Sequence, residues 1–200
     1  MKQSEKSAIT RQKILDAARE EFASNGFSAA RMDAIAASAG VNKQLIYAHF
    51  KNKEHLYSII LESVYSHLAS FEQTLAELKF ESALTIRTVV KKYFDFLSSN
   101  PDFVRLMLWE NLNGAIHVKG IRANLFAGSE KLICEGIEKG IIRSDIDASH
   151  TAMSINMFCF SAFSNVHTIS ALLGRDLLLK EELRNRADHI ADVLTNYMIL

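Results

Sequence analysis

The chain has 200 residues, its 23 Lys and Arg are balanced by 23 Asp and Glu, and 48% of its residues are apolar, which allows one or two domains and excludes a mostly disordered chain. Polar residues interrupt the richest apolar stretch, 152–173, and the first residues lack an apolar core, so we expect neither a membrane span nor a signal peptide. Cys134 and Cys159 are too few and too isolated to predict a disulfide framework or a zinc site, and the expected location is therefore the cytoplasm.

The first predicted helix covers about residues 10–25. Gly26 follows its last apolar residue and is expected to end it. Apolar residues at steps of three and four predict its buried face, formed by Ile14, Leu15, Ala18 and Phe22.

The stretch Arg31–Phe50 predicts two short helices joined by a tight turn. Gly40 stands where the first should stop, because glycine enters a left-handed conformation without a steric penalty, and Asn42 is a good N-cap for the second. A short helix that presents Asn, Lys, Gln, Tyr and His, supported by another helix across a glycine turn, is typical of a helix-turn-helix DNA reader. The pattern alone leaves open a hairpin of any all-helical protein. The second helix is expected to bury Phe50 with either Leu45 or Ile46.

Residues on both sides of this hairpin extend the pattern. Upstream they are Thr10, Arg11, Ile14, Leu15, Ala17, Ala18, Phe22, Gly26 and Phe27, and from the second helix onward they are Tyr47, Phe50, Lys53, Glu54 and Leu56. Over about 50 residues the chain thus resembles the N-terminal domain of the TetR family of transcriptional regulators. The resemblance implies a helix-turn-helix DNA-binding domain at 1–56 and a helical effector-binding and dimerisation domain at 57–200.

The resemblance also implies that the second helix of the hairpin is the recognition helix. Lys43 and Gln44 are then expected to reach base edges, where Lys favours guanine acceptors and Gln can pair with adenine. Tyr47 and His49 match positions that contact phosphates, which position the helix without reading sequence. Ala48 stands where the family is often aromatic and offers only a methyl contact. Two alternatives stay open: Tyr47 packs against the first helix, or His49 is exposed without a role.

Charged residues flank the hairpin. Arg31 stands near where the family usually has a small hydroxyl residue that contacts phosphate; its charge could replace that contact, but the usual N-cap bond is then in question. Lys53 opposes the dipole of the next helix, which is understandable if it contacts a phosphate. Up to His55 the chain has nine basic and six acidic residues, against 14 and 17 in the rest, and phosphate contact requires such positive charge. The DNA-contact candidates are Arg31, Asn42, Lys43, Gln44, Tyr47, Ala48, His49 and Lys53.

The rest of the chain is predicted to be helical throughout, which gives an all-α fold of about nine helices. One long helix, over about 53–79, begins at the DNA and ends in the second domain. Asn100 and Pro101 mark a boundary, because proline suits the first position of a helix. The remaining helices are expected at about 82–98, 101–113, 120–139, 148–173 and 176–198.

Residues with catalytic or metal-binding chemistry are sparse. Asp145, Asp147 and His150 could suggest a metal site, but we prefer a capped turn because no further ligands are identifiable. The sequence has no Gly-rich phosphate loop, no nucleophile motif and no metal-ligand spacing. We therefore expect no enzyme activity, no metal and no cofactor.

The predicted helix 148–173 is apolar nearly all round, so a second chain should cover part of it. The resemblance implies that it pairs with the last helix and with their two-fold copies in a homodimer, which a palindromic site also requires. The interface candidates are Met153, Phe160, Leu183, Ala187, Ile190, Leu194 and Tyr197.

A small-molecule cavity in the C-terminal domain is a further implication of the resemblance. Each of its aromatic and Met candidates, taken singly, is more often a core residue than a pocket residue, and a buried histidine bonded to backbone is the more common role for each of its histidines. Nothing in the sequence identifies the effector. The candidate lining residues are Phe103, Met107, Trp109, Asn113, His117, Phe126, Phe158, Phe163 and His167.

Together these observations predict a homodimeric transcriptional repressor that binds double-stranded DNA at a palindromic operator and is released by an unidentified small molecule. A transcriptional activator remains an alternative, because the sign of regulation depends on where the operator lies. A helical dimer that has lost DNA binding and acts through protein partners is the other alternative.

Overall fold

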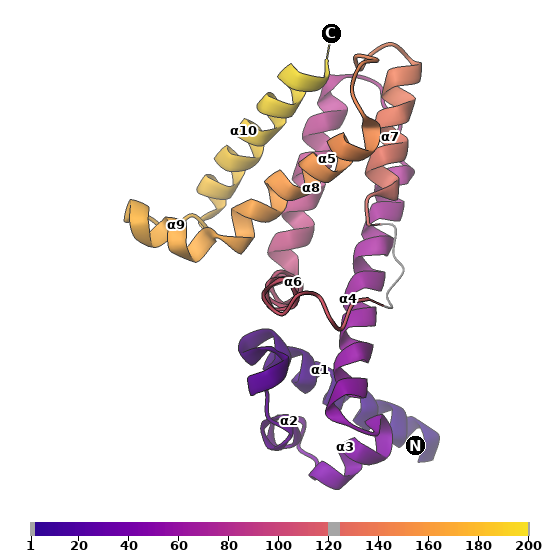
Figure 1. Cartoon of the computed structure of the whole chain (residues 1–200), viewed down its shortest axis with the longest axis vertical. Coiled ribbons are helices and arrows are strands. Elements are labelled where there is room, and N and C mark those ends of the chain that lie inside the picture. The colour runs from indigo at the N-terminus through magenta and orange to yellow at the C-terminus, as the bar shows by residue number, and fades with distance from the viewer. Residues whose placement is uncertain (1–2, 120–124, 200) are drawn as a thin grey trace. The chain divides into compact units, whose positions relative to one another are not determined.

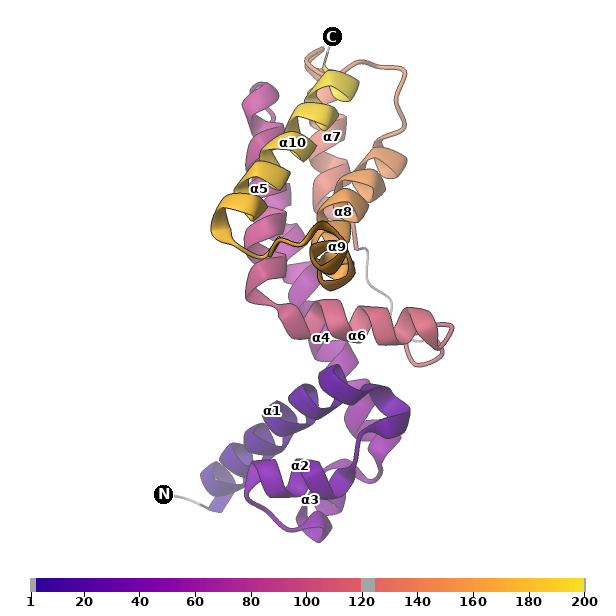
Figure 2. The same cartoon turned by 90° about the vertical axis from the view of Figure 1, so that its left-hand side faces the viewer.

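The computed structural model of the chain describes residues 3–119 and 125–199. These residues form ten α-helices (Figures 1 and 2), and the predicted all-α fold class is confirmed. No helix in the described ranges is long and apolar enough to cross a membrane. The helices are α1 Gln3–Ala29, α2 Met32–Ala39, α3 Lys43–Phe50, α4 Lys53–Ala76, α5 Ala83–Ser99, α6 Pro101–Leu112, α7 Ala127–Glu138, α8 Ala148–Ser164, α9 Val166–Leu173 and α10 Lys180–Met198.

The chain divides into two compact units. The first unit lies within residues 1–66 and 102–122, and the second within 67–101 and 123–200. The first unit therefore holds α1, α2, α3, the beginning of α4 and nearly all of α6. The second unit holds the end of α4 together with α5 and α7 to α10.

Aromatic packing and a glycine kink organise the first unit. Gly26 has φ 69° and ψ 174°, a non-helical conformation that interrupts α1 where the sequence predicts a stop. The rings of Phe22 and Tyr57 lie 4.8 Å apart, and the ring of Phe27 lies 5.1 Å from Tyr57. The indole Nε1 of Trp109 donates a hydrogen bond of 3.2 Å to the Ala23 carbonyl oxygen, which attaches α6 to α1.

A buried carboxylate joins three helices of the second unit. Glu72 of α4 is 2% exposed and accepts hydrogen bonds from the Tyr93 hydroxyl of α5 and from the Ser129 backbone N–H of α7, the latter at 3.0 Å. Burial raises the pKa of Glu72, although these hydrogen bonds oppose the shift. α7 approaches α4 so closely that a Cβ on Gly128 would lie 1.9 Å from the Glu72 carbonyl oxygen.

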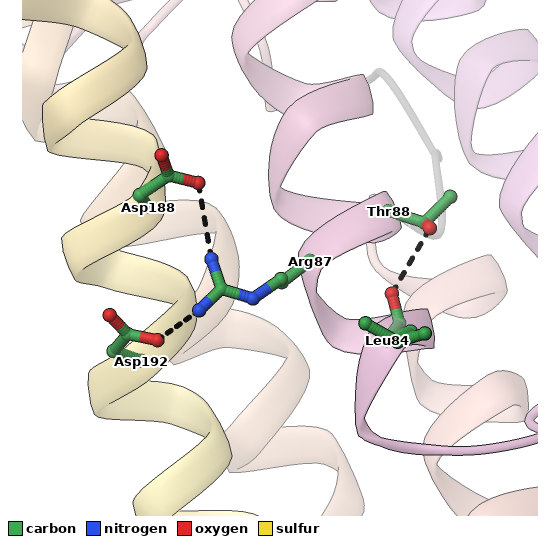
Figure 3. Close-up of polar contacts among 5 residues, drawn as sticks. All are labelled: Leu84, Arg87, Thr88, Asp188 and Asp192. Atoms are coloured by element: carbon green, nitrogen blue, oxygen red, sulfur yellow. Dashed lines mark hydrogen bonds and ion pairs between the residues drawn. The ribbon is translucent and has the colours of Figure 1, made fainter.

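α5 also packs along α10 in the second unit (Figures 1 and 2). The Arg87 guanidinium lies between two carboxylates one turn apart on α10 (Figure 3): it contacts Asp188 at 3.1 Å and also Asp192. One cation thus compensates two acidic residues whose mutual repulsion would otherwise weaken α10.

Helix bounds differ from the predicted ones most clearly at three places. The helix expected over 148–173 is two helices, because Asn165, at φ −108° and ψ 7°, ends α8 and precedes α9. α1 begins at Gln3 rather than near residue 10, since no Gly or Pro precedes that point. α7 begins at Ala127, and residues 120–124 of the helix expected at 120–139 lie outside the described ranges.

The turn before α8 is capped, as predicted. Asp147 accepts a hydrogen bond of 2.7 Å from the His150 backbone N–H. Asp145 forms an ion pair of 2.5 Å with Arg143, and this pair lowers the pKa of Asp145. Asp145 and Asp147, two of the three residues that could suggest a metal site, thus make contacts within the protein.

Candidate DNA-binding surface

The turn between α2 and α3 has the expected helix-turn-helix geometry. Gly40 is left-handed, at φ 65° and ψ 36°, and its N–H bonds back to α2. The N–H of Val41 donates to the Ala36 carbonyl oxygen at 3.0 Å. The Asn42 side chain accepts from the Leu45 N–H at 2.8 Å and so caps α3. These bonds fix the angle at which α3 leaves the turn.

Burial decides which face of α3 is presented outward. Ile46 and Phe50 are fully buried, whereas Leu45 is 37% exposed. Ile46 is therefore the residue that packs inward with Phe50. On α2 the buried residues are the expected ones, Met32, Ile35, Ala36 and Ala39.

The outward face of α3 carries most of the predicted contact residues. Gln44 and Ala48 are exposed, and Tyr47 is 41% exposed. His49 is half-buried, with its ring 5.9 Å from that of Phe50. The exposure of Tyr47 favours an outward role over packing against α1.

Lys43 begins α3 but has a partner within the hairpin. Its ammonium Nζ lies 3.0 Å from Asp33 Oδ2 on α2, and this hydrogen bond raises the pKa of Lys43. The side chain thus stays charged and is held near α2. Asp33 lies ten residues earlier, a separation without a periodic signal in the sequence.

Lys53 is held at the start of α4 by contacts within the first unit. Its Nζ donates to the Ser28 carbonyl oxygen at 3.2 Å and lies 4.9 Å from the centre of the Phe27 ring. Arg11 of α1 is a further cation beside α3, with its guanidinium 5.1 Å from the centre of the Phe50 ring. The sequence pattern includes Arg11 as part of the family resemblance, but Arg11 is not one of the DNA-contact candidates.

Arg31 is the residue before α2. It is extended, at φ −115° and ψ 127°, and its exposed side chain makes no capping hydrogen bond. Its backbone N–H instead donates to Glu21 Oε1 on α1, at 2.9 Å. The usual side-chain cap, which the sequence left in question, is thus absent at Arg31.

The predicted pocket residues are divided between the two units. Phe103 and Phe163 are buried, whereas Asn113, Phe158 and His167 are exposed. Trp109 is bonded to Ala23, and His117 contacts the buried Glu110. The first unit contains Phe103, Met107, Trp109, Asn113 and His117, and the second contains Phe126, Phe158, Phe163 and His167.

One groove of the second unit runs between α8, α9 and α10 and has a volume of about 500 Å³. Val166, Ile169 and Leu183 contribute apolar surface to it, and an ion pair of 3.1 Å joins Arg175 and Glu182 at its lining. Its lining does not include the predicted pocket residues. This groove depends on the break between α8 and α9, which the spacing of the residues does not predict.

The predicted interface residues differ in exposure. Met153 is 43% and Tyr197 49% exposed, whereas Ile190 and Leu194 are at most 3% exposed within the single chain. Phe160, Leu183 and Ala187 are half-buried. Met157, Phe158 and Val193 add exposed apolar side chains to α8 and α10.

Comparison with known proteins agrees with this geometry. Residues 14–58 match the bacterial regulatory proteins of the tetR family, and residues 84–194 match the tetracyclin repressor-like C-terminal domain. The HTH-type transcriptional repressor NicS of Pseudomonas putida is 33% identical over 194 residues, which cover 92% of this chain and 90% of NicS. The HTH-type transcriptional repressor SCO4008 of Streptomyces coelicolor is 31% identical, with 92% of this chain and 95% of the relative covered.

A solved structure supports the same assignment. The crystal structure of SCO4942, a proposed transcriptional regulator of Streptomyces coelicolor, has a TM-score of 0.74 and 25% identity, and the match covers 94% of this chain and 98% of that one. These similarities are to DNA-binding regulators and not to enzymes. This chain is therefore a transcriptional regulator and belongs to the TetR family.

Proposed function

We propose that this regulator is a homodimeric repressor that binds a palindromic operator and is released from it by a small molecule. The observation that carries the proposal is the outward face of α3, where Gln44, Tyr47 and Ala48 are exposed on a helix fixed by the Gly40 turn and the Asn42 cap. A short helix held in this way fits the major groove of DNA.

The roles of the contact residues follow from their chemistry. Lys43 and Gln44 read base edges, and Tyr47 and His49 contact phosphates. Lys53 adds a phosphate contact at the start of α4, where the contacts with Ser28 and Phe27 already position its ammonium. Arg31 and Asn42 complete the set, the first by charge and the second by capping α3.

A second copy of the chain is proposed to cover the apolar side chains on α8 and α10. Large exposed apolar groups gathered on neighbouring helices are typical of an interaction site, and here they include Met153, Phe158 and Tyr197. A two-fold dimer places two recognition helices about 34 Å apart, which suits two half-sites one helical turn apart. In functional terms residues 1–56 bind DNA, and residues 57–200 bind the effector and dimerise.

Release requires that the effector bind the DNA-incompetent state more tightly, and a tenfold shift corresponds to about 1.4 kcal/mol of differential affinity. α4 is one continuous helix from Lys53, a proposed phosphate contact, to Ala76. A tilt of this helix would therefore move a DNA contact.

Selection of bound sequences from random DNA, at two salt concentrations, tests the proposal. We expect an enriched palindrome with two half-sites. Lys43→Ala should lower specific affinity and relax base preference, whereas Lys53→Ala should weaken binding to all sequences and reduce the salt slope by about one unit. Lys91→Ala, on α5, is the matched control and should change neither.

Two results would contradict the proposal. Equal effects of Lys43→Ala on selected and random duplexes would exclude Lys43 from base reading. The selection is repeated with small molecules extracted from cells. If no sequence is enriched at either salt concentration, with or without these molecules, the result would favour a dimer that acts through protein partners. A reporter gene behind the selected operator then separates repression from activation.

A further inference from the structure

The N-terminus of α2 lacks both side chains of a capping box. In that motif a Ser or Thr at the N-cap accepts from the backbone N–H of the third helical residue, and a Glu or Gln at that third position accepts from the N-cap N–H. Here the two positions hold Arg31 and Ala34, and neither side chain offers an acceptor.

A residue of another helix, Glu21 of α1, makes one of the two hydrogen bonds of this motif. Glu21 Oε1 accepts the Arg31 backbone N–H at 2.9 Å, which is the bond that the Glu of a capping box would make. Glu21 precedes the fully buried Phe22 on α1, so its backbone is fixed by the core. The chain then reverses at the Gly26 kink and returns Arg31 to Glu21.

Charge gives this arrangement a second effect. A carboxylate beside a helix N-terminus is favourable to the helix dipole, and a guanidinium there is unfavourable. Glu21 thus supplies the negative charge that α2 prefers, and Asp33 adds another in the first turn of α2. The side chain of Arg31 remains exposed and makes no capping bond.

We infer that Glu21 is a positioning residue that caps α2 from α1, and that this separates helix capping from the phosphate contact of Arg31. If residue 31 were Ser or Thr, its hydroxyl would both cap α2 and contact the phosphate. In this chain Glu21 holds α2, and Arg31 contacts a phosphate by charge. The part that concerns Arg31 rests on the proposed function, whereas the part that concerns Glu21 does not.

Amide hydrogen exchange and thermal unfolding of the full-length protein test the capping role. Glu21→Ala should make exchange of the Arg31 amide about tenfold faster and lower the melting temperature by about 2–4 °C, the shift for one capping interaction in a chain of this size. Glu21→Gln keeps a hydrogen-bond acceptor, so its melting temperature should fall less and its Arg31 amide should exchange more slowly than in Glu21→Ala. Glu20→Ala removes an exposed carboxylate one residue away and is the matched control.

Salt-dependent binding to a random-sequence duplex tests the role of Arg31. Arg31→Ala should lower the salt slope by about 0.9, the value for one phosphate contact, and should leave the melting temperature unchanged. Arg31→Thr restores a capping hydroxyl and should raise the melting temperature of the Glu21→Ala protein.

The two parts fail separately. If Glu21→Ala changes neither Arg31 exchange nor the melting temperature more than Glu20→Ala does, the capping inference is overturned, whatever the DNA result. If Arg31→Ala lowers the melting temperature as much as Glu21→Ala, the division of roles is wrong. If the unaltered protein shows no salt-dependent DNA binding, the proposed function fails, and the exchange experiment still decides the role of Glu21.

Discussion

The hydroxyl of Tyr57 donates a hydrogen bond of 2.9 Å to the carboxylate of Glu110, 53 residues further along the chain. Glu110 is 2% exposed, and its carboxylate also accepts the His117 backbone N–H at 3.2 Å. Burial, more than the bond to Glu110, raises the pKa of Tyr57, so the phenol keeps its proton and remains a donor. This bond joins α4 to α6 within the first unit.

Tyr57→Phe should lower the free energy of unfolding by about 1–3 kcal/mol, because a buried carboxylate then loses a donor while the ring packing is kept. Urea unfolding at neutral pH measures the change. Tyr65→Phe, on the same helix and also buried, is the control and should have a smaller effect, since the hydrogen bond to Glu110 comes from Tyr57. Equal losses in the two variants would contradict this role of the Tyr57 hydroxyl.

Gly26→Ala and Gly40→Ala both place a side chain at a positive φ, 69° and 65°. Gly40→Ala should lose about 1–2 kcal/mol, because its ψ of 36° places it in the left-handed helical region. Gly26→Ala should lose about 1–3 kcal/mol through its backbone, because its ψ of 174° lies in a region that is essentially confined to glycine. Only Gly26 faces a close neighbour, since its Cβ would lie 2.8 Å from the Trp109 indole, and overpacking should add about 1–3 kcal/mol. Trp109 is the chain's single tryptophan, so its fluorescence should shift in Gly26→Ala alone. Indistinguishable stabilities and spectra would show that the indole contact is unimportant.

Glu72 should make the stability of the second unit depend on pH. Its pKa is raised in the folded state, mainly by burial, above the ordinary value of 4.5. The contribution of Glu72 is therefore fully present below about pH 4.5 and is lost as the pH rises through the folded-state pKa. Glu72→Gln does not titrate there, so its stability relative to the unaltered protein should rise from about pH 4 to about pH 7.

The matched control for this titration is Glu62→Gln, which changes an exposed carboxyl of the same helix. It shows what the exchange of a carboxyl for an amide does where the side chain is exposed. A constant difference between Glu72→Gln and the unaltered protein over that pH range would mean that the folded-state pKa of Glu72 is not raised.

Arg87→Met should cost no more than about 1 kcal/mol, because the side chains of this ion-pair network remain 41–61% exposed. The loss comes from Asp188 and Asp192, which then repel each other on successive turns of α10 (Figure 3). In about 1 M salt, where the Debye length is about 3 Å, the difference should shrink. If the stability lost in Arg87→Met does not depend on salt, the loss comes instead from the packing of the aliphatic part of the Arg87 side chain.

Asp33→Asn should release Lys43 from its 3.0 Å ion pair and remove one negative charge from the proposed DNA-binding surface. We expect tighter binding to random duplexes and a salt slope steeper by up to about 0.9, because a free ammonium can pair with a phosphate. The ratio of specific to random affinity should fall. An unchanged ratio would show that Asp33 does not position Lys43 for base reading.

Local sequence was sufficient for the hairpin that carries the proposed DNA contacts. Gly40 and Asn42 act through their own backbone and nearest neighbours, so the turn and the cap could be predicted from residue type and spacing. The same holds for the capped turn at Asp147. Helix periodicity likewise predicted the buried face of α2, but it left Leu45 and Ile46 undecided because adjacent positions share nearly the same face.

Tertiary structure decided the contacts between residues that are distant in the chain. The bonds of Glu21 to Arg31, Asp33 to Lys43 and Tyr57 to Glu110 span 10 to 53 residues and follow no helical period. The break at Asn165 and the burial of Ile190 also depend on which helices pack together. Such contacts form only when separate elements meet, and their energies depend on the burial and distances that packing creates, so sequence spacing carries no signal for them.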